Sequence, residues 1–237
     1  MPPLTRWLCL AVLLSSFAPE ATARVQQYAT RSSDLSNLKQ IAQATLIYAN
    51  DHNAQLPVAT NIWDYASLLA EGGGLEDARM WISKIDPAYT GFDPDTTLLA
   101  PGPTRPRALN PEFKKAKLSV AVPLGTLNTS LPSTTPIAWT RGLQPDGTWA
   151  KHSPYGNEGG HIAFIGGNVH YYRNLTDAGG QLTRYDGSGK TANILEALPP
   201  GTRIGEYIPT AEEQKTWSAA PRKYPHPQRT TRSSSLC

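Results

Sequence analysis

Cysteine is scarce in this chain, with only Cys9 and Cys237 among 237 residues. Cys9 lies inside an apolar N-terminal run that no lipobox-like small residues precede, so the sequence does not predict a lipid anchor. If that run is removed as a signal, Cys237 is left without a partner. A single cysteine cannot form an internal disulfide, so we expect a domain that is stable without one.

An excess of charge is also missing from the body of the chain. The formal net charge is +3, but residues 24–210 hold 16 basic and 16 acidic side chains, and the basic excess lies after residue 210. A nucleic-acid-binding domain would carry its excess of Lys and Arg on the folded surface. The balance therefore argues against nucleic acid as a partner.

No apolar run reaches the roughly 20 residues that a spanning helix needs. The longest is the ten-residue run from Leu8 to Phe17, which follows Arg6 and precedes Ala21-Thr22-Ala23. A positive flank, a short apolar run and a small-x-small site are typical of a secretory signal. We expect residues 1–23 to be a signal peptide cleaved after Ala23. The protein would then be exported to the periplasm or outside the cell, with a membrane tether only if the signal is retained.

An alternative for the same segment is a buried N-terminal helix. Pro19 disfavours it, because proline removes a backbone N–H and clashes with the preceding turn.

The usual signatures of catalysis and metal binding are absent from the sequence. It has no Gly-x-Ser-x-Gly, no His-x-x-x-His and no Cys-x-x-Cys. Gly187-Ser188-Gly189-Lys190-Thr191 is similar to the end of a phosphate-binding loop, but Arg184 stands where that loop needs its first glycine. We interpret the segment as a surface turn and predict no catalytic, cofactor-binding or metal-binding residues.

Periodicity predicts helices in the first third of the chain. Ser33 and Asp34 are candidate caps for a helix over 33–50. One stripe of that helix carries apolar residues spaced for burial: Leu35, Leu38, Ala42, Leu46 and Ala49. A second helix is expected after Asn61, ending at Gly72-Gly73-Gly74, and a short third one over 75–83.

Strands and turns follow. Residues 118–122 and 137–141 are predicted strands, and Pro145-Asp146-Gly147 is a predicted hairpin turn. The strongest hairpin spans 161–172, where a turn at Gly166-Gly167 would place His161 opposite Tyr172. Residues 86–111 are expected to form a long surface loop, residues 193–198 a helical turn, and residues 211–237 a disordered basic tail.

The order of these elements predicts one α+β domain over 24–210, with an N-terminal amphipathic helix packed on an antiparallel β-sheet. Aromatic residues gather in its strand region. Core packing is one explanation; the other is a surface that stacks on sugars, for which the candidate ligand aromatics are Trp139, Trp149, Tyr155 and Tyr172.

Two stretches resemble a known family. The first is Ser36-Asn37-Leu38-Lys39-Gln40-Ile41, continuing through Ile47-Tyr48-Ala49-Asn50-Asp51-His52-Asn53 to Leu56-Pro57. The second is the glycine-rich hairpin that contains Gly159, Gly160, His161, Phe164, Gly166, Gly167 and Tyr171. In order and spacing they are similar to the bacterial type IV pilin-like and type II secretion pseudopilin-like (prepilin-type) proteins common in Planctomycetes and Verrucomicrobia.

The resemblance implies a pilin-like α+β fold and a non-catalytic role as a structural or adaptor component of an envelope secretion or pilus-type assembly. Other pilin-like or secretion-system proteins would be its partners. The chain departs from the family in two places: it lacks the prepilin-peptidase site Gly-Phe-Thr-Leu-Ile-Glu, and Gly166-Gly167 replaces the family's Asp-Gly. The alternative function is an extracytoplasmic module that binds envelope polysaccharide through the Trp/Tyr cluster.

Overall fold

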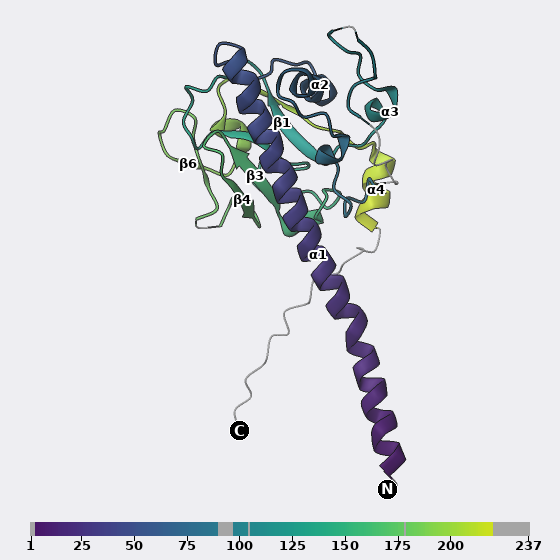
Figure 1. Cartoon of the computed structure of the whole chain (residues 1–237). Helices are drawn as coiled ribbons and strands as arrows, with labels where there is room; N and C mark the ends of the chain where they lie inside the picture. The colour runs from purple at the N-terminus through teal and green to yellow at the C-terminus, as the bar shows by residue number, and fades with distance from the viewer. Residues whose placement is uncertain (1–2, 90–96, 104, 178, 220–237) are drawn as a thin grey trace.

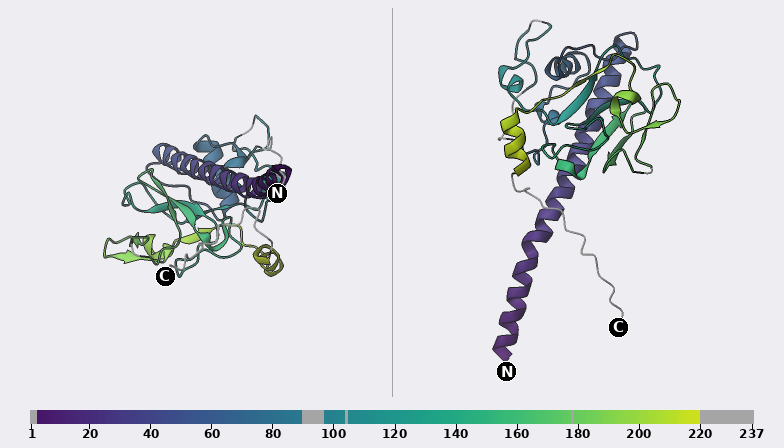
Figure 2. Two further views of the ribbon diagram at one scale, coloured as in Figure 1. Left: turned by 90° about the horizontal axis from the view of Figure 1, so that it is seen from below. Right: turned by 180° about the vertical axis from the view of Figure 1, so that it is seen from behind.

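The structure is a computed structural model that describes residues 3–89, 97–103, 105–177 and 179–219. Its first element is the helix α1, Pro3–Asp51, which is 49 residues long. The first part of α1 extends beyond the rest of the protein, and its last part lies across the domain (Figures 1 and 2). Within the described residues, no helix combines the length and the apolar character needed to cross a membrane.

The predicted helix start at residue 33 is wrong. Residues 24–32 contain neither glycine nor proline, so nothing in their backbone preference ends the helix there. The helix also continues through Pro19, where we expected a break. Asp34 therefore lies inside α1 and does not cap it. The helix passes uninterrupted through Ala21 and Ala23, and the predicted signal cleavage after Ala23 stays a prediction.

The buried face of α1 overlaps the predicted stripe but is rotated from it. Leu38, Ala42 and Ala49 are buried as expected, whereas Leu35 and Leu46 are partly exposed. The residues that complete the buried face are Ile41, Ala44 and Thr45. The small side chains on this face allow a close approach by the next helix: a Cβ at Gly73 would lie 2.5 Å from the carbonyl oxygen of Ala44.

The second helix follows the sequence prediction. α2 spans Ile62–Gly72, and the Asn61 side chain accepts a hydrogen bond from the Asp64 N–H at 3.0 Å. The predicted third helix is a single 3-10 turn, η1, Ala78–Trp81. Residues 86–111 are not purely a surface loop, because Leu98 and Leu99 are buried in the core; residues 90–96 and 104 lie outside the described part.

The main sheet is antiparallel and has the strand order β4-β3-β2-β1-β7. Its strands are β1 Val120–Leu124, β2 Pro136–Thr140, β3 Gly160–Phe164, β4 Val169–Tyr172 and β7 Arg203–Gly205. Every residue of β1, β2 and β3 is buried. Both faces of these central strands are therefore covered; α1 contacts β2 and β3 on one face. The chain is an α+β protein.

The remaining elements are short. They are α3 Pro111–Lys114, η2 Gly156–Glu158, η3 Ile194–Ala197, the small hairpin of β5 Leu182–Thr183 and β6 Lys190–Thr191, and α4 Ala211–Ala219. η3 confirms the predicted turn at 193–198. The surface turn predicted over 187–191 is right only in its first part, because Lys190 and Thr191 form β6 and Thr191 is buried. The tail is not wholly without structure, because α4 is helical; residues 220–237 lie outside the described part.

The β3–β4 hairpin has a register one residue away from the predicted one. His161 pairs with Tyr171, not with Tyr172. The Phe164 N–H donates to the Asn168 carbonyl at 3.1 Å, so the loop has three residues and ends at Gly167, whose φ is 81°. A three-residue loop with glycine in this left-handed conformation is a standard hairpin alternative to the two-residue turn that Gly166-Gly167 suggested.

Candidate functional site

The aromatic residues predicted as a sugar-stacking surface are mostly part of the core. Trp139, Trp149 and Tyr155 are buried, and the Trp149 Nε1–H donates to the Thr140 carbonyl at 3.3 Å. Tyr172 is partly buried. Buried rings cannot stack on a ligand from solvent, so the core-packing explanation holds for the first three.

Several residues of the family-like hairpin lie in the core or in the loop. Gly160 lies against an indole, where an added Cβ would be 2.5 Å from Trp149 Nε1. Phe164 is buried, Gly166 and Gly167 form the loop, and Gly159 has a φ of 130°.

His161 and Tyr171 project from the face of the hairpin that meets α1. Their rings lie 5.3 Å apart, and Arg31 of α1 stacks on Tyr171 at 5.4 Å. The strands thus place these two side chains against the helix.

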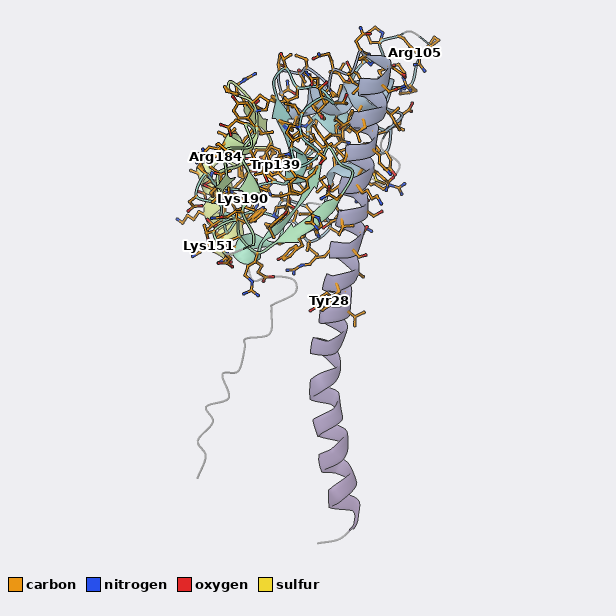
Figure 3. All side chains as sticks on the ribbon, turned by 90° about the vertical axis from the view of Figure 1, so that its left-hand side faces the viewer. Tyr28, Arg105, Trp139, Lys151, Arg184 and Lys190 are labelled. Atoms are coloured by element: carbon orange, nitrogen blue, oxygen red, sulfur yellow. The ribbon has the colours of Figure 1, made fainter. Side chains whose placement is uncertain are left out.

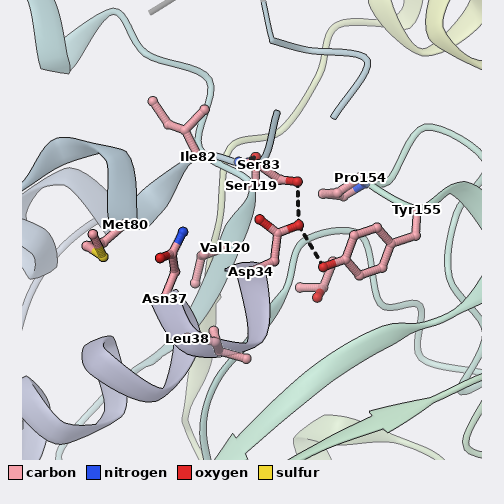
Figure 4. Close-up of a pocket in the computed structure, with 11 residues that line it drawn as sticks. Asp34, Asn37, Leu38, Met80, Ile82, Ser83, Ser119, Val120, Pro154 and Tyr155 are labelled. Atoms are coloured by element: carbon pink, nitrogen blue, oxygen red, sulfur yellow. Dashed lines mark hydrogen bonds between the residues drawn. The ribbon is translucent and has the colours of Figure 1, made fainter. Parts of the chain in front are cut away.

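The candidate site is the junction between α1 and the domain, and Asp34 is at its centre (Figure 4). The Ser83 hydroxyl donates to Asp34 Oδ2 at 2.5 Å, and the Tyr155 hydroxyl donates to the same oxygen at 2.8 Å. Ser83 is itself held by Ser119, whose Oγ accepts from the Ser83 N–H at 2.9 Å. One carboxylate of α1 therefore joins two segments that are far away in the sequence.

A histidine extends this hydrogen-bond chain. Tyr155 Oη lies 3.2 Å from His161 Nδ1. Because the tyrosine proton is directed to Asp34, the oxygen of Tyr155 is left to accept, so the neutral histidine carries its proton on Nδ1. The backbone N–H of His161 donates to Thr140 Oγ1 at 2.9 Å. The chain runs from β3 through Tyr155 to α1.

Arg31 makes a second connection, one helical turn before Asp34. Its guanidinium forms an ion pair with Glu158, and its Cζ lies 5.2 Å from the centre of the Tyr155 ring. The Tyr171 hydroxyl donates to the Glu158 carbonyl at 2.6 Å. Both sides of the ion pair are mostly buried, so salt screens it less than a surface pair.

Burial governs the ionisation of the junction. It raises the pKa of Asp34 to about 6, against the lowering effect of the Ser83 and Tyr155 hydrogen bonds. Burial, together with the charge of Arg31, lowers the pKa of His161 to about 4. Burial and the neighbouring Asp34 raise the pKa of Tyr155 well above its ordinary value. At neutral pH the cluster contains an ionised aspartate beside a neutral histidine.

The geometry is that of an attachment rather than of a catalytic triad. In a triad, a histidine lies between the carboxylate and the nucleophilic hydroxyl; here Ser83 contacts the carboxylate directly and His161 is only 4% exposed. The cavity beside Asp34 measures about 20 Å³, which is space for about one water molecule. The cluster fixes α1 to the domain through buried polar contacts.

A larger groove of about 580 Å³ runs from the same carboxylate along α1. Asp34 and Asn37 line both the small cavity and this groove, whose other wall is the segment from Arg79 to Tyr89.

A second buried ion pair lies next to the junction: the Asp86 N–H donates to the Ser83 carbonyl, and the charge of Asp86 adds to the effect of burial in raising the pKa of Asp34. Arg141, just after β2, donates through Nη2 to both carboxylate oxygens of Asp86 at 2.9 and 3.0 Å, and to the His152 carbonyl at 3.2 Å. Both side chains are 1% exposed. Within the described part of the chain, Arg141 Nε and Nη1 have no hydrogen-bond partner.

Sequence reasoning missed Asp34, Ser83, Asp86 and Arg141 as members of buried clusters. A carboxylate next to the apolar stripe of a helix was the available signal, and we interpreted it as a cap. Among the described residues, no group of three or more His, Cys, Asp or Glu has the arrangement of a metal site. Comparison of the chain with models of known families, with curated proteins and with solved structures found no match.

Proposed function

We propose that this protein is an exported, non-catalytic component of an envelope assembly of the secretion or pilus type, in which α1 carries the contacts with partner proteins. The single observation behind the proposal is the form of α1. Its last part contacts strands β2 and β3 of the antiparallel sheet, while its first part extends beyond the domain (Figures 1 and 3); we take this arrangement as support for a pilin-like role.

The extending part of α1 exposes large apolar side chains. Val25 and Tyr28, one helical turn apart, are 69% and 70% exposed. Figure 3 shows Tyr28 on the helix beyond the body of the protein. An apolar stripe on an isolated stretch of helix gains stability when another surface covers it. These positions are therefore where we expect partner contact.

The junction supports the same role. A helix that transmits contacts to a domain needs a firm attachment, and Asp34 and Arg31 supply it through buried hydrogen bonds and an ion pair. Buried polar groups with fixed partners specify one docking geometry better than apolar contacts alone.

Photocrosslinking in the cells that make the protein tests the proposal. A photoreactive phenylalanine analogue would replace Tyr28, and in a control chain it would replace Ile47, which is 54% exposed at the other end of the same helix. We expect the Tyr28 position to give cross-links to pilin-like or secretion-system proteins, or to a second copy, and the Ile47 position to give none of them. Equal cross-linking from both positions, or none from Tyr28, would contradict the proposal.

N-terminal sequencing after cell fractionation tests the export part. A chain that begins at Arg24 outside the cytoplasm agrees with a cleaved signal, and an intact Met1 in the membrane fraction agrees with a tethered component. An intact chain in the cytoplasm contradicts export.

A further inference from the structure

The C-terminal helix α4 is attached to the domain without burying any of its residues. Its main anchor is Glu213, whose carboxylate pairs with Lys117 Nζ at 2.6 Å and accepts from the Tyr207 hydroxyl at 2.8 Å. Glu213 also caps its own helix by accepting from the Thr210 N–H at 2.9 Å. One carboxylate therefore makes most of the polar contacts of the helix.

A single indole makes the other anchor. The Trp217 ring lies over two cations, with Lys117 Nζ at 5.2 Å and Arg141 Cζ at 5.5 Å from its centre, and beside Tyr207 at 6.3 Å. Cation–π contacts are individually weak where solvent reaches them, as at the partly exposed Lys117, and stronger where the cation is buried, as at Arg141. The Lys117–Glu213 pair is partly buried, with its side chains 31% and 22% exposed. Because α4 buries none of its residues, it loses little apolar contact when it separates from the domain.

The surface under α4 is formed by one end of the main sheet. Lys117 precedes β1, Arg141 follows β2 and Tyr207 follows β7. We call these three residues the α4-docking surface. Two of its members are cationic, and buried Arg141 keeps N–H donors that have no partner within the described chain. The surface therefore suits a helix that offers one carboxylate and one aromatic ring four residues apart, as Glu213 and Trp217 do.

The connection to α4 is short. Tyr207 is the last residue that belongs to the docking surface, and Ile208-Pro209-Thr210 lead to the first residue of α4. Ile208 is 77% exposed. Pro209, next to it, is buried. A short connection that contains proline favours exchange of the element that follows it.

We propose that α4 is an exchangeable element, and that at high protein density the occupant of the α4-docking surface is the α4 helix of a second copy of this chain. The second copy carries the matching Glu213 and Trp217 by identity, so the contacts are the same in the two arrangements. Two copies that exchange α4 make each contact twice and form a closed pair. Within one chain the short connection gives α4 a local concentration on the order of millimolar, so exchange requires comparable protein density. The inference does not depend on the proposed function.

A charge exchange tests the proposal on the full chain. Glu213→Lys places a lysine opposite Lys117, and Lys117→Glu in another chain places a glutamate opposite Glu213, so neither variant can dock its own α4. When the two variants are mixed, the lysine introduced in the first chain can pair with the glutamate introduced in the second, and Glu213 of the second chain can pair with Lys117 of the first. A zero-length carbodiimide joins a lysine to a carboxylate only in direct contact, and it should give a covalent dimer of twice the monomer mass in the mixture alone. The double variant K117E/E213K is the matched control and should give a cross-linked monomer.

The wild-type chain provides the second measurement, which holds even if a variant fails to fold. Isotope-labelled and unlabelled chains are mixed and cross-linked, and mass spectrometry counts Lys117–Glu213 links that join the two labels. We expect mixed links to rise at least fivefold between ~10 µM and ~1 mM protein, the range in which exchange begins to compete.

The pair Lys115–Glu112, at 2.8 Å on the domain itself, reports random collision. Mixed Lys117–Glu213 links that never exceed the mixed links of this control pair, or a variant mixture without covalent dimer, would overturn the proposal.

Discussion

Asp34→Asn should change how the stability of the protein depends on pH. In the folded chain the pKa of Asp34 is raised from 3.8 to about 6. The folded state therefore binds this proton more tightly than the unfolded state, and the free energy of unfolding falls as pH rises from about 4 to 6. The pKa of Asp34 thus differs by about two between the folded and unfolded states, which at 1.36 kcal/mol per pKa unit amounts to about 3 kcal/mol of stability.

His161 acts in the opposite direction over nearly the same pH range. Its pKa is lowered from 6.5 to about 4, so the unfolded state binds the proton more tightly. Its contribution is lost as pH falls from 6.5 to 4, and it also amounts to roughly 3 kcal/mol. In the wild-type chain the two contributions nearly cancel between pH 4 and 6.5.

The substitution by asparagine removes the Asp34 contribution to the pH dependence and leaves that of His161. Its Oδ1 accepts from Ser83 and Tyr155 as the carboxylate does, and its NH₂ group takes the place of the other oxygen. The variant should be at least as stable as the wild type at pH 7.5, because no charge is buried. Between pH 6.5 and 4 it should lose about 3 kcal/mol more than the wild type does. His161→Gln should show the reverse and gain stability relative to the wild type on acidification.

Urea unfolding followed by tryptophan fluorescence, repeated from pH 4 to 7.5, measures these differences. Groups other than the substituted one titrate alike in both chains, so subtracting the wild-type profile isolates Asp34. Parallel profiles for Asp34→Asn and the wild type, within about 0.5 kcal/mol, would refute the raised pKa and with it the account of the junction as a buried carboxylate.

Two further substitutions test the packing. Gly160→Ala should destabilise the protein by about 1–3 kcal/mol, because the added Cβ would lie 2.5 Å from Trp149 Nε1 in a filled core; Gly102→Ala, with nothing within 4 Å, is the control, and equal melting temperatures would contradict the packing. Asp86→Asn should cost about 3–5 kcal/mol in urea unfolding, because it leaves the Arg141 charge buried without its partner; a loss below about 1 kcal/mol would show that solvent reaches this pair.

Local signals were sufficient for several elements. Asn61 caps α2 as predicted. This could be predicted because both the cap and the apolar face of a helix depend on residues only a few positions apart in the sequence. The β3–β4 hairpin was also identified, but its register was not, since Gly166 and Gly167 both accept the backbone of a turn. Packing across the strands, which pairs His161 with Tyr171, decides between the two loop lengths.

The candidate site could not be predicted in the same way. Asp34 meets Ser83 and Tyr155 from positions 49 and 121 residues apart in the chain, and Asp86 meets Arg141 across 55 residues. No periodicity or turn signal connects such positions. The length of α1 was missed for a related reason: Ser33 and Asp34 are good caps by type, but a helix begins there only if the preceding residues leave it.

The length of α1 also makes it a lever. At 1.5 Å per residue, the stretch from Asp34 back to Pro3, which is present only as long as the predicted signal is retained, measures about 46 Å. A tilt of about 10° at the junction would therefore move the first turn of a straight helix by about 8 Å. Small rearrangements among the few buried side chains around Asp34 would thus be amplified mechanically into much larger displacements at the far end of the helix.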